Sequence, residues 1–102
     1  MIEIRFSPDA LGDLQEIKGY INDDLQNTTA AENTIRTIMD RIKRLTDFPD
    51  MGAPLSSVVQ TQSDYRYLVC GNYTVFYRHE KDTVLIVRVL YGRRDYMRVL
   101  FE

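Results

Sequence analysis

The sequence predicts an α+β domain with the element order β-α-α-β-β-β, in which a helical hairpin packs on a mostly antiparallel sheet. Two patterns predict this order. Between residues 10 and 48, apolar residues recur at spacings of three and four, which is typical of amphipathic helices. From residue 65 onward, short apolar segments are separated by tight turns, which is typical of strands. The length of 102 residues suits one domain (1–102) with one core.

A short strand and a helix are expected first. "IEIRF" (2–6) alternates apolar and polar residues, which predicts a strand. Ser7 is a favourable N-cap and Pro8 suits the first helical position, so a helix should begin there. The apolar stripe of this helix consists of Ala10, Leu11, Leu14, Ile17, Ile21 and Leu25.

A second helix should follow a short loop. Thr29 and Glu32 form a capping box, and Pro49 and Gly52 end the pattern. The loop is short, so the helices should form an antiparallel hairpin. We interpret their acidic residues as solvated surface, with an acidic recognition face as the alternative. The second stripe consists of Ile35, Ile38, Met39, Ile42, Leu45 and Phe48.

Residues 49–64, "PDMGAPLSSVVQTQSD", are rich in Pro, Gly and Ser and are expected to form a loop. Three strands should follow. "YRYLVC" (65–70) and "YTVFYRH" (73–79) flank "GN", a two-residue hairpin signal. "TVLIVRVLY" (83–91) is nearly continuous in apolar residues, which favours a central strand.

The turn at Gly71–Asn72 predicts the register of the hairpin and pairs Tyr77 with Arg66. Alternation then places Arg66, Tyr73 and Tyr77 on one face. If the following turn is also tight, Arg88 joins that face. The opposite face should carry Tyr65, Tyr67, Phe76 and Arg78.

Composition and charge exclude several classes of function. The net charge is −2, but residues 1–63 hold six Lys/Arg and ten Asp/Glu, whereas residues 64–102 hold seven and five. Only the C-terminal part could therefore offer a basic surface. The single Cys70 and single His79 argue against a disulfide and a zinc site, so no metal or cofactor is expected. No signal peptide or membrane span is visible, which indicates a cytoplasmic protein.

Arginine and tyrosine side chains are the remaining candidates for a working surface. The sequence has no phosphate-binding glycine loop and no context for a Ser-His-Asp or Cys-His arrangement. Guanidinium groups bind phosphates or acidic partner residues, and aromatic rings stack on bases. The alternative is that the tyrosines only form strands and the arginines are only solvated. The candidates for target binding are Arg66, Tyr77, Arg88, Tyr91, Arg93, Arg94 and Tyr96.

The sequence resembles the RelE/ParE superfamily of bacterial type II toxin–antitoxin toxins. The matching segments, in the order found in the family, are "FSPDALGDLQEIKGYI", "LTDFPDMGAPL", "YRYLVCGNYTVFYR" and "VLIVRVLYGRRDYMRVLF". The resemblance implies two helices on an antiparallel sheet. It also implies a cytosolic growth inhibitor, neutralised by an antitoxin encoded beside it, and operator DNA bound only through that antitoxin.

The resemblance leaves two kinds of target. RelE-type members cut mRNA in the ribosomal A site and tend to carry an Arg where this sequence has Thr74 in "YTVFY". ParE-type members poison DNA gyrase and often read "RVLHGRRD", close to "RVLYGRRD" here, where Tyr91 replaces the His. A pI near 5.4 also disfavours a site among ribosomal phosphates.

We therefore expect a ParE-like toxin that binds DNA gyrase. The first alternative is a ribosome-dependent mRNA endoribonuclease, in which arginines stabilise the transition state and a Tyr assists proton transfer. The second is an inactive homologue that only binds the antitoxin. An exposed apolar groove should receive an amphipathic antitoxin helix. The candidates for lining it are Met51, Tyr67, Met97 and Phe101.

Overall fold

The computed structural model describes residues 2–55 and 64–92, and it confirms the α+β class and the β-α-α-β-β-β order. One short strand is added within the segment that was expected to be loop. The elements are β1 (Glu3–Phe6), α1 (Pro8–Gly19), the π-helical turn η1 (Tyr20–Asp24), α2 (Thr28–Lys43), the 3₁₀ turn η2 (Arg44–Thr46), β2 (Ala53–Pro54), β3 (Tyr65–Cys70), β4 (Tyr73–Glu80) and β5 (Thr83–Tyr91).

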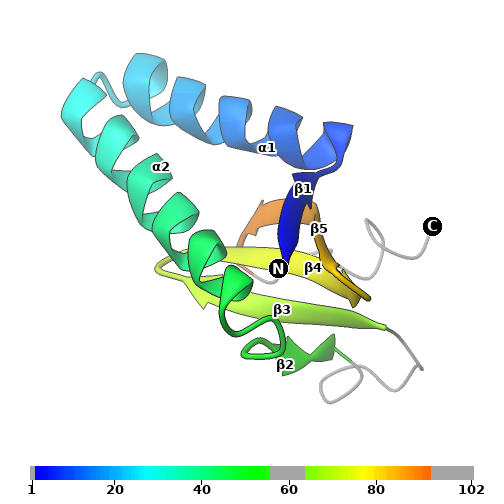
Figure 1. The fold of residues 1–102 in the computed structure, drawn as a ribbon. Coiled ribbons are helices and arrows are strands. Elements are labelled where there is room, and N and C mark those ends of the chain that lie inside the picture. The colour runs from blue at the N-terminus through cyan, green and yellow to red at the C-terminus, as the bar shows by residue number, and fades with distance from the viewer. Residues whose placement is uncertain (1, 56–63, 93–102) are drawn as a thin grey trace.

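The five strands form one sheet in the order β1-β5-β4-β3-β2. β1 runs parallel to β5, and the other neighbours are antiparallel. Figure 1 shows α1 and α2 on one side of this sheet, joined at the end far from β1. β5 is an interior strand, as its apolar run predicts. The predicted hairpin register is confirmed, since Tyr77 lies opposite Arg66. β2 pairs with β3 at the sheet edge, where its proline is tolerated.

The first helical segment changes its geometry before the predicted stripe ends. α1 stops at Gly19, and the Leu25 N–H donates to the Tyr20 carbonyl at 3.2 Å, a π-type bond. A π turn holds one more residue than an α turn, so side chains beyond it leave the stripe. Accordingly Ile21 is buried, whereas Leu25 is 57% exposed. Leu11 is also exposed, so neither Leu11 nor Leu25 belongs to the core.

The second helix starts earlier than its capping box predicts. Asn27 is the N-cap, and its side-chain oxygen accepts the Ala30 N–H at 2.9 Å. The prediction of a cap at Thr29 is therefore wrong, because Asn27 already satisfies this free N–H of the first turn. The helix passes into η2 after Lys43, and Phe48 is exposed rather than part of the stripe.

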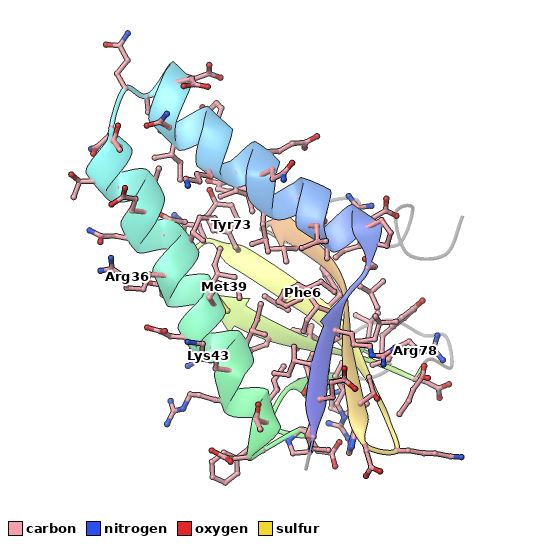
Figure 2. The ribbon with its side chains drawn as sticks, turned by 45° about the horizontal axis from the view of Figure 1, so that its top comes forward. Phe6, Arg36, Met39, Lys43, Tyr73 and Arg78 are labelled. Carbon is pink, nitrogen blue, oxygen red and sulfur yellow. The ribbon has the colours of Figure 1, made fainter. Side chains whose placement is uncertain are left out.

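The main core lies between the two helices and the sheet. Figure 2 shows Phe6, Met39 and Tyr73 in this space, whereas Arg36 and Lys43 lie on the outer side of α2. Among the residues described, no helix combines the length and apolarity needed to cross a membrane. The buried core residues are Ala10, Ile38, Ile42, Leu45, Leu68, Cys70, Val75, Tyr77, Val84, Ile86 and Val89.

Candidate functional site

Arg66 fastens β3 to the segment before β2. Its Nη1 donates to the Gly52 carbonyl at 2.7 Å and to the Asp50 carbonyl at 3.2 Å. Its Nε also lies 3.5 Å from Asp50 Oδ1. The side chain remains 29% exposed, so part of the guanidinium can still meet a partner. Arg66 is therefore a structural residue and a candidate contact residue together.

Tyr77 is buried beneath the same segment and is unavailable to a target. It has no exposed surface, and its hydroxyl accepts the Gly52 N–H at 2.9 Å. Burial raises the pKa of its hydroxyl, so Tyr77 stays neutral. The predicted position of Tyr77 opposite Arg66, on the same face of the sheet, is confirmed. Its inclusion in a contact surface fails because this face is covered by the helices.

Arg88 does not join the face of Arg66, because a β-bulge intervenes. The turn before β5 is tight, with Glu80 opposite Thr83, as the prediction required. The pairing then shifts, so that Tyr77 lies opposite Ile86 and Phe76 lies opposite Arg88. The extra residue reverses the alternation beyond it. Arg88 instead turns to α1.

Asp13 of α1 receives the guanidinium of Arg88. Its carboxylate oxygens accept from Arg88 Nε and Nη2 at 2.7 Å each, and one also accepts the Val89 N–H at 2.9 Å. The pair is well shielded, with side chains 9% and 23% exposed. The hydrogen bond with Asp13 raises the pKa of Arg88 and outweighs the opposing effect of burial. Because its guanidinium is engaged by Asp13, Arg88 stabilises the fold and is not available to contact a target.

Among the described candidates for target binding, Tyr91 has the most exposed side chain. It is 67% exposed at the end of β5. Its ring meets Tyr73 edge-on, with centroids 5.5 Å apart and an interplanar angle of 76°. Gly92 follows with a positive φ of 64°, and its N–H donates to the Asn72 carbonyl at 2.8 Å. Tyr91 is thus held at the hairpin end of the sheet. The other predicted contact residues, Arg93, Arg94 and Tyr96, lie outside the described residues.

The two described antitoxin candidates, Met51 and Tyr67, differ in exposure. Met51 is 38% exposed in the segment before β2. Tyr67 is half-buried and packs with Leu55 and Phe76, on the sheet face away from the helices. Met97 and Phe101 fall outside the described residues.

Thr74 lies inside the sheet, at the position where the nuclease branch of the resembled family carries Arg. It is 2% exposed and lies between Val69 of β3 and Leu90 of β5. In the part of the chain described, no group of His, Cys, Asp and Glu could hold a metal ion.

His79 makes two contacts that the sequence did not predict. Its Nδ1 lies 2.9 Å from Asp50 Oδ1, and its Nε2 lies 3.0 Å from the Lys81 carbonyl. Asp50 therefore faces both His79 and Arg66. No sequence pattern indicates this cluster, because Asp50 comes from a loop 29 residues away from His79.

A groove lies between the first helical segment and the ends of β4 and β5. Its volume is about 870 Å³, and sequence reasoning did not locate it. Tyr20 of η1 and Leu25, which follows η1, are a signal that could have pointed there, since both are large side chains close to the polar residues Asn22, Asp23 and Asp24. The lining includes Ile17, Tyr20, Ile21, Leu25, Tyr73, Leu90 and Tyr91.

Comparison with known proteins places the chain among toxins. The sequence model described as "ParE toxin of type II toxin-antitoxin system, parDE" matches residues 4–96. No curated protein matches the sequence.

Solved structures share the fold. One is described as the chromosomal ParDE TA system from P. aeruginosa; it is 20% identical, has a TM-score of 0.76, and the match covers 91% of this chain and 98% of that chain. The isolated E. coli RelE toxin is 12% identical with a TM-score of 0.60, covering 98% and 94%. The E. coli DinJ-YafQ complex is 14% identical with a TM-score of 0.55, covering 100% of both chains. These likenesses bear out two helices on a mostly antiparallel sheet.

Proposed function

The chain belongs to the ParE toxin family and is the toxin component of a type II toxin–antitoxin system, and from this we propose that it stops bacterial growth by binding DNA gyrase. The observation that carries the proposal is the family match over residues 4–96, which is to ParE rather than to the ribosome-dependent nucleases. Gyrase is the target that the resemblance to ParE-type toxins implies.

The burial of Thr74 supports a binding mechanism. A nuclease needs groups that move a proton and stabilise the charged transition state at the cut phosphate. Thr74 is 2% exposed and lies within the sheet, so it can offer a phosphate neither charge nor access. The pI near 5.4 also fits a protein target better than a ribosomal site.

The target surface that we propose is the C-terminal end of β5 together with the residues after it. Tyr91 provides an exposed ring, and Arg93, Arg94 and Tyr96 follow it directly in sequence. Tyrosine and arginine are the side chains enriched at interface hot spots. Arg66 provides a further, partly exposed guanidinium in β3.

A cognate antitoxin is the second partner in this proposal. Structures of similar fold include a ParDE system and the DinJ-YafQ complex, in which the chain of similar fold belongs to a toxin–antitoxin pair. We expect the antitoxin to be encoded beside this chain, to contact Met51 and Tyr67, and to provide the contacts with operator DNA. The site of action would be the cytoplasm, where gyrase works.

Pulse labelling after induction in bacteria tests the target. We expect thymidine incorporation to fall first while methionine still enters protein. An immediate fall in methionine incorporation would instead support the ribosome-dependent nuclease. Unchanged growth and labelling would support an inactive homologue. Purified gyrase then provides the direct test, because the chain should inhibit supercoiling in the absence of ribosomes.

A further inference from the structure

The end of β5 is attached to the β3–β4 hairpin one residue beyond its last paired residue. Tyr91 lies opposite Tyr73 as the final pair of β5 with β4. Gly92 then donates its N–H to the Asn72 carbonyl at 2.8 Å. Figure 1 shows this end of β5, in orange, at the same end of the sheet as the turn that joins β3 and β4. The position of the Gly92 nitrogen is therefore set by the hairpin.

Gly92 adopts a backbone conformation that most other residues avoid. Its φ is +64°, in the left-handed region where a Cβ would crowd the backbone. Packing does not explain the glycine, because among the described residues no atom lies within 4 Å of a Cβ built at Gly92. Glycine is thus favoured here by the torsion angle. Among other residues, Asn and Asp enter this region most readily.

The torsion angle at Gly92 decides the direction in which the chain leaves the sheet. Because the N–H is bonded to the Asn72 carbonyl, a change of φ turns everything after Gly92 about the N–Cα bond. The nearest ordinary φ, about −60°, differs from +64° by a rotation of roughly 120°. The first residues to be redirected are Arg93 and Arg94, which belong to the proposed target surface.

We propose that Gly92 is a positioning residue for toxicity, whose left-handed conformation presents Arg93 and Arg94 to the target beside the exposed ring of Tyr91. The inference rests on the proposed function and adds the residue that sets the geometry of the target surface. Gly92 has no side chain for a target to contact, so it acts through the direction of the backbone. A fixed direction strengthens the contact, because preorganised side chains lose less conformational entropy on binding.

Growth arrest by the full chain, at graded induction in bacteria, compares Gly92→Ala with Gly92→Asn. Alanine avoids the left-handed region, so Gly92→Ala should need about tenfold more protein to stop growth. Asparagine enters this region more readily, so Gly92→Asn should retain most of the toxicity despite its larger side chain. A close approach of the target to the Gly92 backbone predicts the opposite order, because the larger side chain would then be worse tolerated. Equal toxicity of the two variants, or the opposite order, would overturn the proposal.

Val84→Ala separates positioning from a loss of stability. Val84 is fully buried and pairs with Ile4 and His79, at the end of β5 away from the hairpin turn. Its alanine variant should lower the urea unfolding midpoint more than Gly92→Ala does, because it removes buried methyl groups. It should nevertheless stop growth as the unchanged chain does, at equal amounts of protein by immunoblot. An equal loss of toxicity from Val84→Ala and Gly92→Ala would show that stability alone matters, and would overturn the proposal.

Supercoiling by purified gyrase separates a failure of this inference from a failure of the gyrase proposal. If the unchanged chain stops growth but leaves supercoiling intact, gyrase is not the target. The order of toxicity of the Gly92 variants then still decides the inference. If the unchanged chain inhibits supercoiling and Gly92→Ala inhibits it equally well, the positioning role is wrong and the gyrase proposal stands.

Discussion

Asp13 and Arg88 form a bidentate ion pair that joins α1 to the end of β5, with both N–H···O distances at 2.7 Å. β1 pairs with β5 only as far as Ile86, so within the described residues the rest of that edge has no neighbouring strand. Side chains replace the missing strand along this edge. The Ser7 hydroxyl donates to the Val87 carbonyl, and Asp13 accepts the Val89 N–H. The start of α1 thus replaces a strand beside the bulge, and it holds the end of β5 from which Tyr91 projects.

Removing Asp13 should destabilise the fold strongly. Asp13→Ala leaves the guanidinium of Arg88 and the N–H of Val89 without their acceptor, which should lower the free energy of unfolding by about 3 kcal/mol. Urea unfolding measures this change. In a double-mutant cycle with Arg88→Met, the two substitutions should be clearly non-additive, since they remove the same ion pair.

The control for this prediction is an exposed ion pair. Arg5 and Glu3 lie 3.3 Å apart with side chains 65% and 60% exposed. Glu3→Ala should change the free energy of unfolding by only about 0.5 kcal/mol or less. A comparable loss from both alanine variants would mean that the Asp13–Arg88 pair has no special structural role.

Gly52 should not tolerate a side chain. A Cβ at Gly52 would lie 2.6 Å from the Tyr77 hydroxyl and 2.7 Å from the Tyr67 carbonyl. Gly52→Ala must therefore displace buried groups, and we expect a loss of about 1–3 kcal/mol in urea unfolding. Gly12→Ala is the control, because nothing lies within 4 Å of its Cβ position in α1. That change should be neutral or stabilising, since alanine favours helix.

Local patterns predicted most of the fold because the strands and their turns are specified by near neighbours. The two-residue turn at Gly71–Asn72 sets the pairing of Arg66 with Tyr77, and both were found as expected. The helix details were missed for a physical reason. Asn27 and Thr29 are both acceptable N-caps, and the sequence did not distinguish them. The π turn at Tyr20–Asp24 has no composition signal that separates it from α-helix.

The candidate site was predicted less well because it depends on contacts distant in sequence. Alternation put Arg88 on the wrong face, because the β-bulge shifts the pairing of β5 with β4 and no local signal indicates the extra residue. Its partner Asp13 lies 75 residues away, and the sequence analysis interprets the acidic residues of that helix as solvated surface. Tyr77 resembles a contact residue by type. Only the packing of α2 and the Gly52 segment over the sheet shows that it is core.

Alkaline pH should destabilise the protein, because the buried Tyr77 hydroxyl and Cys70 thiol resist losing their protons in the folded state. Burial raises the pKa of Tyr77 above its ordinary 10.0, and burial likewise raises the pKa of Cys70 above 9.0, although Arg41 partly opposes the latter. The unfolded chain therefore releases these protons first. Stability should be constant with respect to these groups below about pH 9 and fall as pH rises beyond it. Urea midpoints across this range measure the fall, and Tyr77→Phe should make it shallower above pH 10.

The buried thiol should also react slowly. Cys70 is 4% exposed, and its raised pKa keeps it protonated, so alkylation needs an opening of the fold. We expect iodoacetamide to modify the native chain at least about tenfold more slowly than the urea-unfolded chain at the same pH. Equal rates would contradict the burial of Cys70.

Toxicity should depend on the end of β5 and the arginines that follow it. The Tyr91 ring is exposed but fixed by its edge-on contact with Tyr73, so Tyr91→Ala removes a preorganised contact with little cost to the fold. The Arg93→Ala/Arg94→Ala double variant removes two adjacent cations. We expect each to weaken inhibition of gyrase supercoiling by about tenfold or more, with bacterial growth restored in proportion.

Phe48→Ala is the control for this prediction, because Phe48 is exposed to a similar extent but lies after η2. It should remain as toxic as the unchanged chain. If the Arg93→Ala/Arg94→Ala variant is folded and still fully toxic, those arginines do not contact the target. If Tyr91→Ala is folded and still fully toxic, the exposed Tyr91 ring does not contact the target.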